Sequence, residues 1–290
     1  MESTSSEIID GYRLRQHLQT GQTSQVYEVV EIQSNRHFAM KMLLPETARD
    51  PMHRQMLLHE ASVGKQLSHP NIIRIYKVNL SKTTPYFIME FFPSGSLRAR
   101  LLQKDMLFIH QNLQHILKQA ATGLAFMNAS GWVHRDVKPD NILVNASAEV
   151  RLIDFAIAYR IPRGIARWFH TRKSAGTRSY MSPEQIRGEI LDGRADIYSF
   201  GCTVYELATG RPPFRGKDVT ELMTKQLTEK PVTPQSFNPN ITDDFARFIL
   251  HMLAKKREDR PKDFHEVLMA LRNIRLFKDL PKKAGDSDEG

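Results

Sequence analysis

The segment HRDVKPDN at residues 134–141 constrains the fold of this chain more than any other feature of its sequence. It follows residues 110–129, whose apolar side chains recur at the spacing of an amphipathic helix. A strand-like run, VRLI at residues 150–153, then leads directly into Asp154 and Phe155. An HRD triplet alone carries little information. A long helix, a polar loop and a strand that ends in a carboxylate, in this order, are difficult to obtain by chance. They predict a functional site at this loop.

The chain changes character at residues 93–95, a Pro-Ser-Gly run. Strand-like runs before this point lie at residues 26–30, 38–43, 72–78 and 86–90. A helix is expected from about Pro51, which suits a first helical turn, to about Leu67. Helices are predicted after this point at residues 110–129, 194–209, 218–227, 243–254 and 264–273. The pattern indicates an α+β chain.

The domain organisation follows from this division. We expect a small strand-rich lobe over about residues 12–92 and a larger helical lobe over about residues 93–277. Residues 1–11 are expected to be a flexible terminus. Residues 278–290 are small and charged, which predicts a disordered tail.

Composition excludes several classes of protein. Hydrophobic residues make up 41% and charged residues 25%, as in an ordinary globular chain, and no apolar run is long enough to span a bilayer. Cys202 is the single cysteine, so no internal disulfide framework forms, and no Cys/His cluster indicates zinc. With no secretory signal, we expect a cytoplasmic chain, or the cytosolic part of a longer membrane-anchored protein. The net charge of +9 leaves acidic partners open, but no nucleic-acid motif or aromatic platform accompanies it, so nucleic acid is not expected.

Further pieces occur in a fixed order around the central segment. Lys41 ends the run FAMK, Glu60 follows nineteen residues later on the expected helix, and GTRSYMSPE occupies residues 176–184. With these pieces, residues 12–275 or so resemble the eukaryotic-type protein kinase family, most of all the bacterial Ser/Thr kinases. The resemblance implies a bilobal fold, with a β-rich N-lobe that holds one key helix and a larger helical C-lobe. It also implies transfer of the γ-phosphate of ATP to protein Ser or Thr hydroxyls.

The resemblance assigns the phosphate and metal ligands. Lys41 would hold the α- and β-phosphates, oriented by an ion pair with Glu60. Asp154 and Asn141 would bind magnesium, with manganese as an alternative, because hard oxygen ligands suit these ions.

It also assigns the groups that act on the acceptor hydroxyl. Asp136 would accept or orient the proton of the hydroxyl, and Lys138 would neutralise the γ-phosphate. Lys138 and Thr177 both favour Ser/Thr rather than Tyr acceptors.

A nucleotide pocket is implied in the same way. Val26 and Ala39 would cover the adenine and Leu143 would lie beneath it, with Met89 as the gatekeeper. The complete expected set is Leu18, Gly21, Val26, Ala39, Lys41, Met89, Glu90, Phe92 and Leu143. The plainer alternative is that these apolar strand residues are ordinary core.

Two charged residues are expected to have structural roles. Glu184 should pair with Arg260 beneath the substrate platform, and Asp196 should brace the backbone of the catalytic loop.

Three positions depart from the family pattern. The phosphate-covering loop reads QTGQTSQV at residues 19–26, which retains only Gly21 of its glycines. Ala156 stands where Asp154-Phe155 is usually followed by glycine. Gly64 replaces a bulky residue one turn after Glu60, which predicts a hole against Phe155 and a weakened helix. These departures motivate the alternative of a pseudokinase, a nucleotide-binding scaffold or allosteric partner, although the catalytic set itself is intact.

Regulation is predicted on the segment between Asp154 and Glu184. Thr171 is the leading candidate for an activating phosphorylation and Ser174 the second, with Arg135 expected to receive the phosphate. Self-association for phosphorylation in trans is an associated expectation. Beyond ATP and protein substrates, the sequence names no particular substrate.

Overall fold

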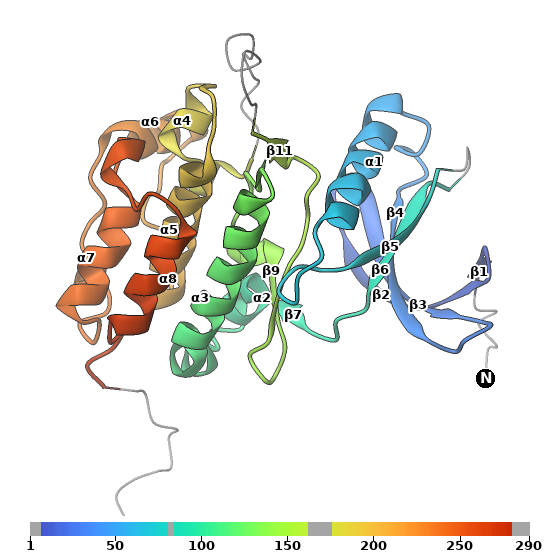
Figure 1. The fold of residues 1–290 in the computed structure, drawn as a ribbon, viewed down its shortest axis with the longest axis horizontal. Coiled ribbons are helices and arrows are strands. Elements are labelled where there is room, and N and C mark those ends of the chain that lie inside the picture. The colour runs from blue at the N-terminus through green and yellow to red at the C-terminus, as the bar shows by residue number, and fades with distance from the viewer. Residues whose placement is uncertain (1–6, 81–83, 162–175, 280–290) are drawn as a thin grey trace, which may run out of the picture. The chain divides into compact units, whose positions relative to one another are not determined.

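The described part of the chain, residues 7–80, 84–161 and 176–279 of this computed structural model, contains two units (Figure 1). The first unit consists of Met1–Pro93 together with Asp154–Ala156, so the strand-rich part includes the short run that begins at Asp154. The second unit consists of Ser94–Ile153 together with Ile157–Gly290. Each unit contains candidate functional residues and is described by itself.

The first unit is a six-stranded antiparallel sheet with one long helix. Its strands run in the order β1-β2-β3-β4-β6-β5. Their bounds are β1 Ile8–Ile9, β2 Tyr12–Thr20, β3 Ser24–Glu31, β4 His37–Leu43, β5 Ile75–Asn79 and β6 Tyr86–Glu90. Helix α1 spans Pro51–Gln66 and begins where the Asp50 side chain accepts a hydrogen bond from the Met52 amide. A proline at the first turn and an acidic N-cap explain why the helix starts here.

Alternation along the strands separates two apolar clusters. Tyr86 and Ile88 belong to one cluster with Met40, whereas Phe87 belongs to the other with Ala61 of α1. Since successive strand residues point to opposite faces, α1 packs on the face that carries Phe87. Side chains on this face of the sheet, including Phe87, are therefore the ones that α1 contacts.

The second unit is helical. Its helices are α2 Leu97–Leu102, α3 Met106–Ala129, α4 Pro183–Ile186, α5 Gly193–Thr209, α6 Val219–Thr228, α7 Asp243–Met252 and α8 Phe264–Asn273. Its short strands are β7 Gly95–Ser96, β8 Trp132–Val133, β9 Ile142–Val144, β10 Val150–Leu152 and β11 Tyr159–Arg160. Single 3-10 turns lie at η1 Pro139–Asn141, η3 Arg178–Tyr180, η4 Pro234–Ser236 and η5 Arg257–Asp259. Strands β10, β9 and β7 form one small sheet, and β11 pairs with β8.

Helix α5 is the centre of this unit. Every residue from Ala195 to Ala208 is buried, so polar groups along it must find their partners inside the protein. Asp196 and Glu206 lie on this helix, and both have such partners.

Every helix that the sequence predicts is present, and the differences lie at the ends. Helix α3 starts at Met106, a turn earlier than predicted, because Asp105 caps it by accepting from the Phe108 amide. The sequence missed α2 and α4, which are too short to show periodicity. The strand predicted at residues 72–78 begins only at Ile75.

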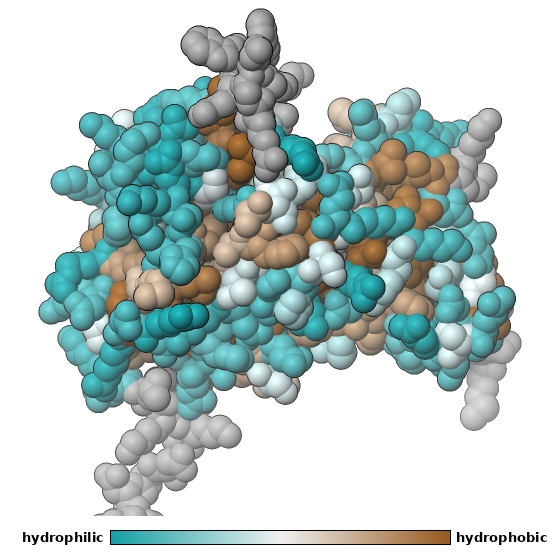
Figure 2. Space-filling view, viewed as in Figure 1, coloured by the Kyte–Doolittle hydropathy of each residue, from teal (hydrophilic) through white to brown (hydrophobic). Residues whose placement is uncertain are grey.

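The face drawn in Figure 2 is largely hydrophilic, with apolar residues in separate patches. Among the residues that the structure describes, no helix combines the length and the apolar character needed to cross a bilayer.

Candidate active site

The first part of the candidate site is an ion pair between β4 and α1. The Lys41 Nζ atom lies 2.8 Å from Oε1 and 2.7 Å from Oε2 of Glu60, and both side chains are largely buried. Asp154 Oδ1 lies 3.8 Å from the same Nζ. Burial lowers the pKa of Lys41, but the carboxylates of Glu60 and Asp154 outweigh it, so the pKa lies above its ordinary value. The predicted Lys41–Glu60 pair is confirmed.

Glu60 is held in a demanding environment. Burial raises the pKa of Glu60 to about 7, and Lys41 opposes this shift. The ionised form of this buried carboxylate is favoured by its partner Lys41.

Sheet register explains which residues accompany Lys41. Val26 of β3 and Phe87 of β6 lie directly opposite Lys41, and Met89 lies opposite Ala39. Opposite residues in an antiparallel pair point to the same face, as do residues two apart along a strand. Four residues of the expected nucleotide set, Val26, Ala39, Lys41 and Met89, thus share the face on which α1 packs.

The remaining nucleotide residues are placed differently. Leu18 on β2 is 43% exposed, while Glu90 and Phe92 are half-buried at and after the end of β6. Leu143 lies on β9 in the second unit.

The turn that carries Gly21 closes the hairpin of β2 and β3, whose pairing shifts register between His17 and Gln19. Pairing continues to Gln19–Val26 and Thr20–Gln25, and the Gly21 amide donates to the Ser24 carbonyl at 2.8 Å. The carbonyl of Thr23, the residue before Ser24, accepts from the Leu44 amide and the Thr47 hydroxyl.

Gly64 corrects one prediction. A Cβ atom at Gly64 would lie 2.4 Å from Ile75 Cδ1 and 3.4 Å from Phe155 Cδ2. The predicted hole against Phe155 is therefore wrong, because the Ile75 side chain occupies the space above the glycine. Phe155 is fully buried beside it.

Asp154 begins the short run that belongs to the first unit. Its φ of 67° lies in the left-handed region, which aspartate tolerates better than most residues. Its Oδ1 accepts a 3.4 Å hydrogen bond from the Ala156 amide. The Asp154 side chain remains 36% exposed, so it is open to a ligand.

The second unit contains its own group of candidate residues, in the loop between β8 and β9. Fully buried Asp196 accepts hydrogen bonds from the backbone amides of His134 at 2.8 Å and Arg135 at 2.9 Å, and from the Asn128 side chain at 3.0 Å. Burial raises the pKa of Asp196, and these donors oppose it. Arg135 has a φ of 69°, a strained conformation that the two backbone bonds help to hold. The predicted bracing by Asp196 is confirmed.

Asp136 is the best-supported carboxylate of this loop. Its Oδ2 lies 2.7 Å from Lys138 Nζ and 2.9 Å from Asn141 Nδ2, and its Oδ1 accepts from the Thr177 amide at 2.9 Å. Burial raises the pKa of Asp136. Lys138 and the Thr177 hydrogen bonds lower it by a larger amount, so the pKa lies below its ordinary value. The Asp136 side chain is 10% exposed. It is an ionised carboxylate that still reaches solvent.

Thr177 reaches Asp136 because of the glycine before it. Gly176 has a φ of 131°, and a Cβ atom there would lie 2.8 Å from the Arg135 carbonyl oxygen. Only glycine fits this approach. The Thr177 hydroxyl accepts from Lys138 Nζ.

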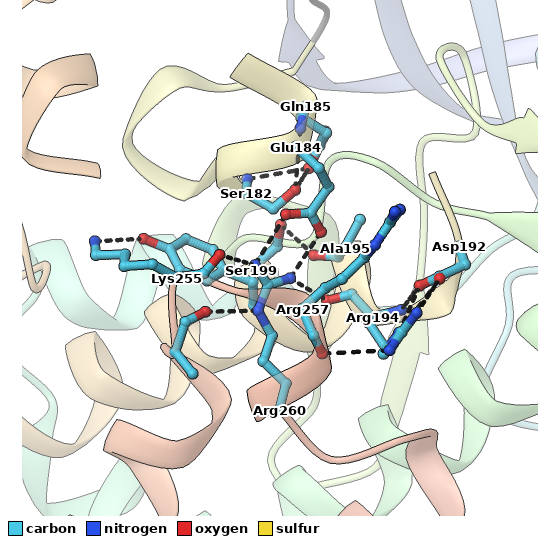
Figure 3. A network of polar contacts seen from close by, with 12 residues as sticks. Ser182, Glu184, Gln185, Asp192, Arg194, Ala195, Ser199, Lys255, Arg257 and Arg260 are labelled. Atoms are coloured by element: carbon cyan, nitrogen blue, oxygen red, sulfur yellow. Dashed lines mark hydrogen bonds and ion pairs between the residues drawn. The ribbon is translucent and has the colours of Figure 1, made fainter. Parts of the chain in front are cut away.

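The predicted Glu184–Arg260 pair is also confirmed (Figure 3). Arg260 Nη1 and Nη2 donate to the two Glu184 oxygens at 2.7 and 2.9 Å, and each residue is 3% exposed. The remaining donors of Arg260 bond to the carbonyls of Ala254, Arg194 and Lys255. The guanidinium is therefore saturated, as a buried charge requires.

Two groups of residues complete the comparison with the sequence. Thr171 and Ser174 lie outside the described residues. Arg98, which the sequence did not single out, bonds to Asp140 of the catalytic loop. No sequence signal links two positions so far apart. Within the described residues, no cluster of three or more His, Cys, Asp or Glu side chains could hold a metal ion.

A family model, that of the protein kinase domain, matches residues 12–270. The chain belongs to this family. Its fold is accordingly the bilobal α+β protein kinase fold, of which the strand-rich and helical units are the two lobes.

Curated relatives are Ser/Thr kinases of bacteria. The chain is 34% identical over 286 residues to the serine/threonine-protein kinase PknB of Mycobacterium leprae, which covers 97% of this chain and 45% of the relative. It is 32% identical over 294 residues to PknB of Mycolicibacterium smegmatis, covering 99% of this chain and 47% of the relative. It is 31% identical over 264 residues to a probable serine/threonine-protein kinase of Clostridium acetobutylicum, covering 91% and 40%. The chain thus spans less than half the length of the relatives that it matches.

Proposed function

We propose that this kinase domain transfers the γ-phosphate of magnesium-bound ATP to serine or threonine hydroxyls of proteins. The observation that carries the proposal is the set of hydrogen bonds at Asp136, whose carboxylate is held by Lys138 and the Thr177 amide and remains partly exposed. Kinship with Ser/Thr kinases and the intact catalytic set support the same activity.

Asp136 is proposed to receive or orient the proton of the acceptor hydroxyl. Its lowered pKa keeps it ionised at neutral pH, and general-base assistance contributes about 10²–10⁴-fold to a rate. Lys138 lies between Asp136 and the Thr177 hydroxyl, so its ammonium is fixed beside the carboxylate that is proposed to meet the acceptor. There it would neutralise charge on the transferred phosphoryl group.

Lys41 is proposed to bind the α- and β-phosphates. The bidentate bond from Glu60 fixes the position of its ammonium, and burial makes the charge more effective than it would be in water.

Asp154 and Asn141 fit a magnesium ion by the chemistry of their donors. Magnesium usually takes one or two carboxylates together with substrate phosphates, and it does not need a dedicated protein cage. The amide nitrogen of Asn141 donates to Asp136, so the amide oxygen is the atom available for the proposed metal. When bound, the ion supplies charge neutralisation at the phosphate oxygens. Manganese shares this preference for oxygen.

The face of the sheet that carries Val26, Ala39 and Met89 is proposed to contact the adenine. Its apolar character and its continuity with Lys41 support this role. Leu18, Gly21, Glu90, Phe92 and Leu143 complete the proposed set.

Phosphorylation of Thr171, and secondarily Ser174, is proposed to activate the enzyme. The support is Arg135, a buried guanidinium that follows His134 directly and would pair with a phosphate. Phosphorylation between two copies of the chain is the expected route. Mass spectrometry after incubation with ATP, together with the activity of Thr171→Ala and Ser174→Ala, tests this regulation.

The activity is tested with radiolabelled ATP and a generic protein substrate, comparing the wild type with Asp136→Asn. We expect magnesium-dependent incorporation into serine or threonine in the wild type and a loss of at least 100-fold in the variant, as the general-base contribution implies. Equal background incorporation in both proteins, with retained ATP binding, would show a nucleotide-binding scaffold instead.

A further inference from the structure

A cluster of charged side chains adjoins the catalytic loop and takes no part in the proposed chemistry. Arg98 on α2 donates through Nη1 to Glu206 Oε1 at 2.8 Å and through Nη2 to Glu206 Oε2 at 3.2 Å. Its Nε donates to Asp140 Oδ2 at 3.2 Å, and its Nη2 also donates to the Tyr180 hydroxyl. The hydroxyl in turn donates to Glu206. All four residues belong to the second unit.

The cluster forms an acidic recess that Arg98 fills. The side chains of Glu206 and Tyr180 are nearly buried, that of Arg98 is 25% exposed and that of Asp140 is 42% exposed. Burial raises the pKa of Tyr180, and the neighbouring Glu206 raises it further, so the phenol is neutral. Without the guanidinium, two carboxylates would face one another across a phenol and open toward solvent.

The recess is built for a guanidinium. Two parallel bonds to one carboxylate match the planar fork of arginine, and the third direction reaches a second carboxylate. Burial works against the charged form, but the hydrogen bonds to Glu206 raise the pKa of Arg98 above its ordinary value. A lysine ammonium could not satisfy the same acceptors in the same geometry.

The recess lies close to the proposed path of the substrate. Asp140 is four residues after Asp136, so the chain limits their separation to about 14 Å. Tyr180 lies three residues after Thr177, whose amide bonds to Asp136. An extended peptide whose acceptor hydroxyl lies at Asp136 spans about 14 Å in four residues. A side chain up to about four residues from the acceptor can therefore reach the recess.

We propose that Arg98 is a specificity-determining residue: by filling the recess of Asp140, Tyr180 and Glu206, it removes selection for a cationic side chain near the acceptor. This inference rests on the proposed kinase activity. The preferred substrates are then proteins without an arginine requirement near the phosphorylated residue. Loss of Arg98 converts the recess into a subsite for a substrate arginine.

The test compares serine peptides that carry one arginine or one glutamine at each position within four residues of the acceptor. For the wild type, we expect the ratio of kcat/KM values, arginine over glutamine, to stay within about threefold of unity. For Arg98→Ala, the ratio should rise roughly 10–100-fold at one position, as a charge-assisted hydrogen bond to a buried carboxylate implies. Adding Glu206→Gln to Arg98→Ala should abolish the gain.

Arg100→Ala is the matched control. Arg100 lies on the same helix, but it pairs with Asp105 at 2.7 Å and stacks on Phe108, away from the recess. Its peptide ratios should equal those of the wild type. Ratios unchanged by Arg98→Ala, or changed equally by both variants, overturn the inference.

A binding readout separates this inference from the proposed activity. Methylguanidinium at low concentration should refill the recess of Arg98→Ala and raise its melting temperature, whereas methylammonium should not. The wild type and Arg100→Ala should show no such rise. Where Arg98→Ala does not fold alone, recovery on refolding with methylguanidinium but not methylammonium supports the recess, and no recovery with either overturns it. The melting-temperature measurement needs no turnover. If the wild type is as inactive as Asp136→Asn, the proposed activity is refuted, but the recess can still be tested in this way.

Discussion

Gly64 on α1 and Ile75 on β5 interlock so closely that a single added carbon would lie 2.4 Å from the Ile75 Cδ1 atom. The glycine lies one turn after Glu60, and Phe155 closes the other side of the contact. Helix α1, which carries Glu60, can thus pack closely on the sheet because Gly64 has no side chain.

Gly64→Ala should therefore destabilise the protein. Alanine improves helix propensity by about 1 kcal/mol, but overpacking against Ile75 costs about 1–3 kcal/mol and also displaces Glu60. Ile75→Val removes the Cδ1 atom and should relieve part of that cost. Urea unfolding of the two single variants and the double variant measures the coupling. Strictly additive effects would contradict the interlock.

The ion pair of Glu184 and Arg260 should contribute strongly to folding. Removing one partner of a buried pair leaves the other charge uncompensated and costs about 3–5 kcal/mol. We expect Arg260→Met and Glu184→Gln each to lower the free energy of unfolding by this order, measured in urea. Arg247→Met serves as the control, since the Arg247–Asp244 pair is exposed and should cost about 1 kcal/mol or less.

The Thr177 hydroxyl should matter for turnover. Thr177→Val keeps the backbone bond to Asp136 but removes the acceptor for Lys138 Nζ. Loss of a hydrogen bond to a charged group is worth about 1.5–3 kcal/mol, so kcat should fall roughly 10–100-fold. Thr177→Ser retains the hydroxyl and should stay within a few-fold of the wild type. Equal kcat values in the valine variant and the wild type would exclude this role.

Lys255 should give a specific dependence of stability on pH. Its ammonium donates to the Gln226 carbonyl at 2.7 Å and lies 4.0 Å from the centre of the Phe214 ring, and burial lowers the pKa of Lys255 to about 8. An unfolded lysine has a pKa of about 10.4. Between these values the unfolded state binds more protons, so this residue makes stability rise as the pH increases. The unfolding free energy of the wild type minus that of Lys255→Met should increase from pH 8 to pH 10 and be flat below pH 7.

Sequence periodicity predicted the long elements of this fold because their core residues recur at regular spacing. Helix α8 has the bounds predicted for it, and α1 ends within one residue of the expected Leu67. The short helix α4 carries a capping box of Ser182 and Gln185 rather than an apolar stripe, so periodicity could not reveal it.

The candidate site was predictable where motifs carry it and unpredictable where packing decides. Lys41 and Glu60 were paired from their family spacing, and the structure places them in contact. The hole expected at Gly64 followed from the residue alone, whereas its neighbour Ile75 is distant along the chain until the sheet forms. Arg98 likewise meets Glu206 only through the tertiary fold.

The anchoring of the catalytic loop on Asp196 has a consequence for how the helical unit opens. The amides of His134 and Arg135 bond to the Asp196 carboxylate in the first turn of α5, a helix that is buried from Ala195 to Ala208. We therefore expect solvent deuterons to reach these two amides only when the loop and the first turn of α5 separate from one another. We therefore expect the loop that is proposed to do the chemistry to exchange as slowly as the start of this buried helix, unlike a surface loop.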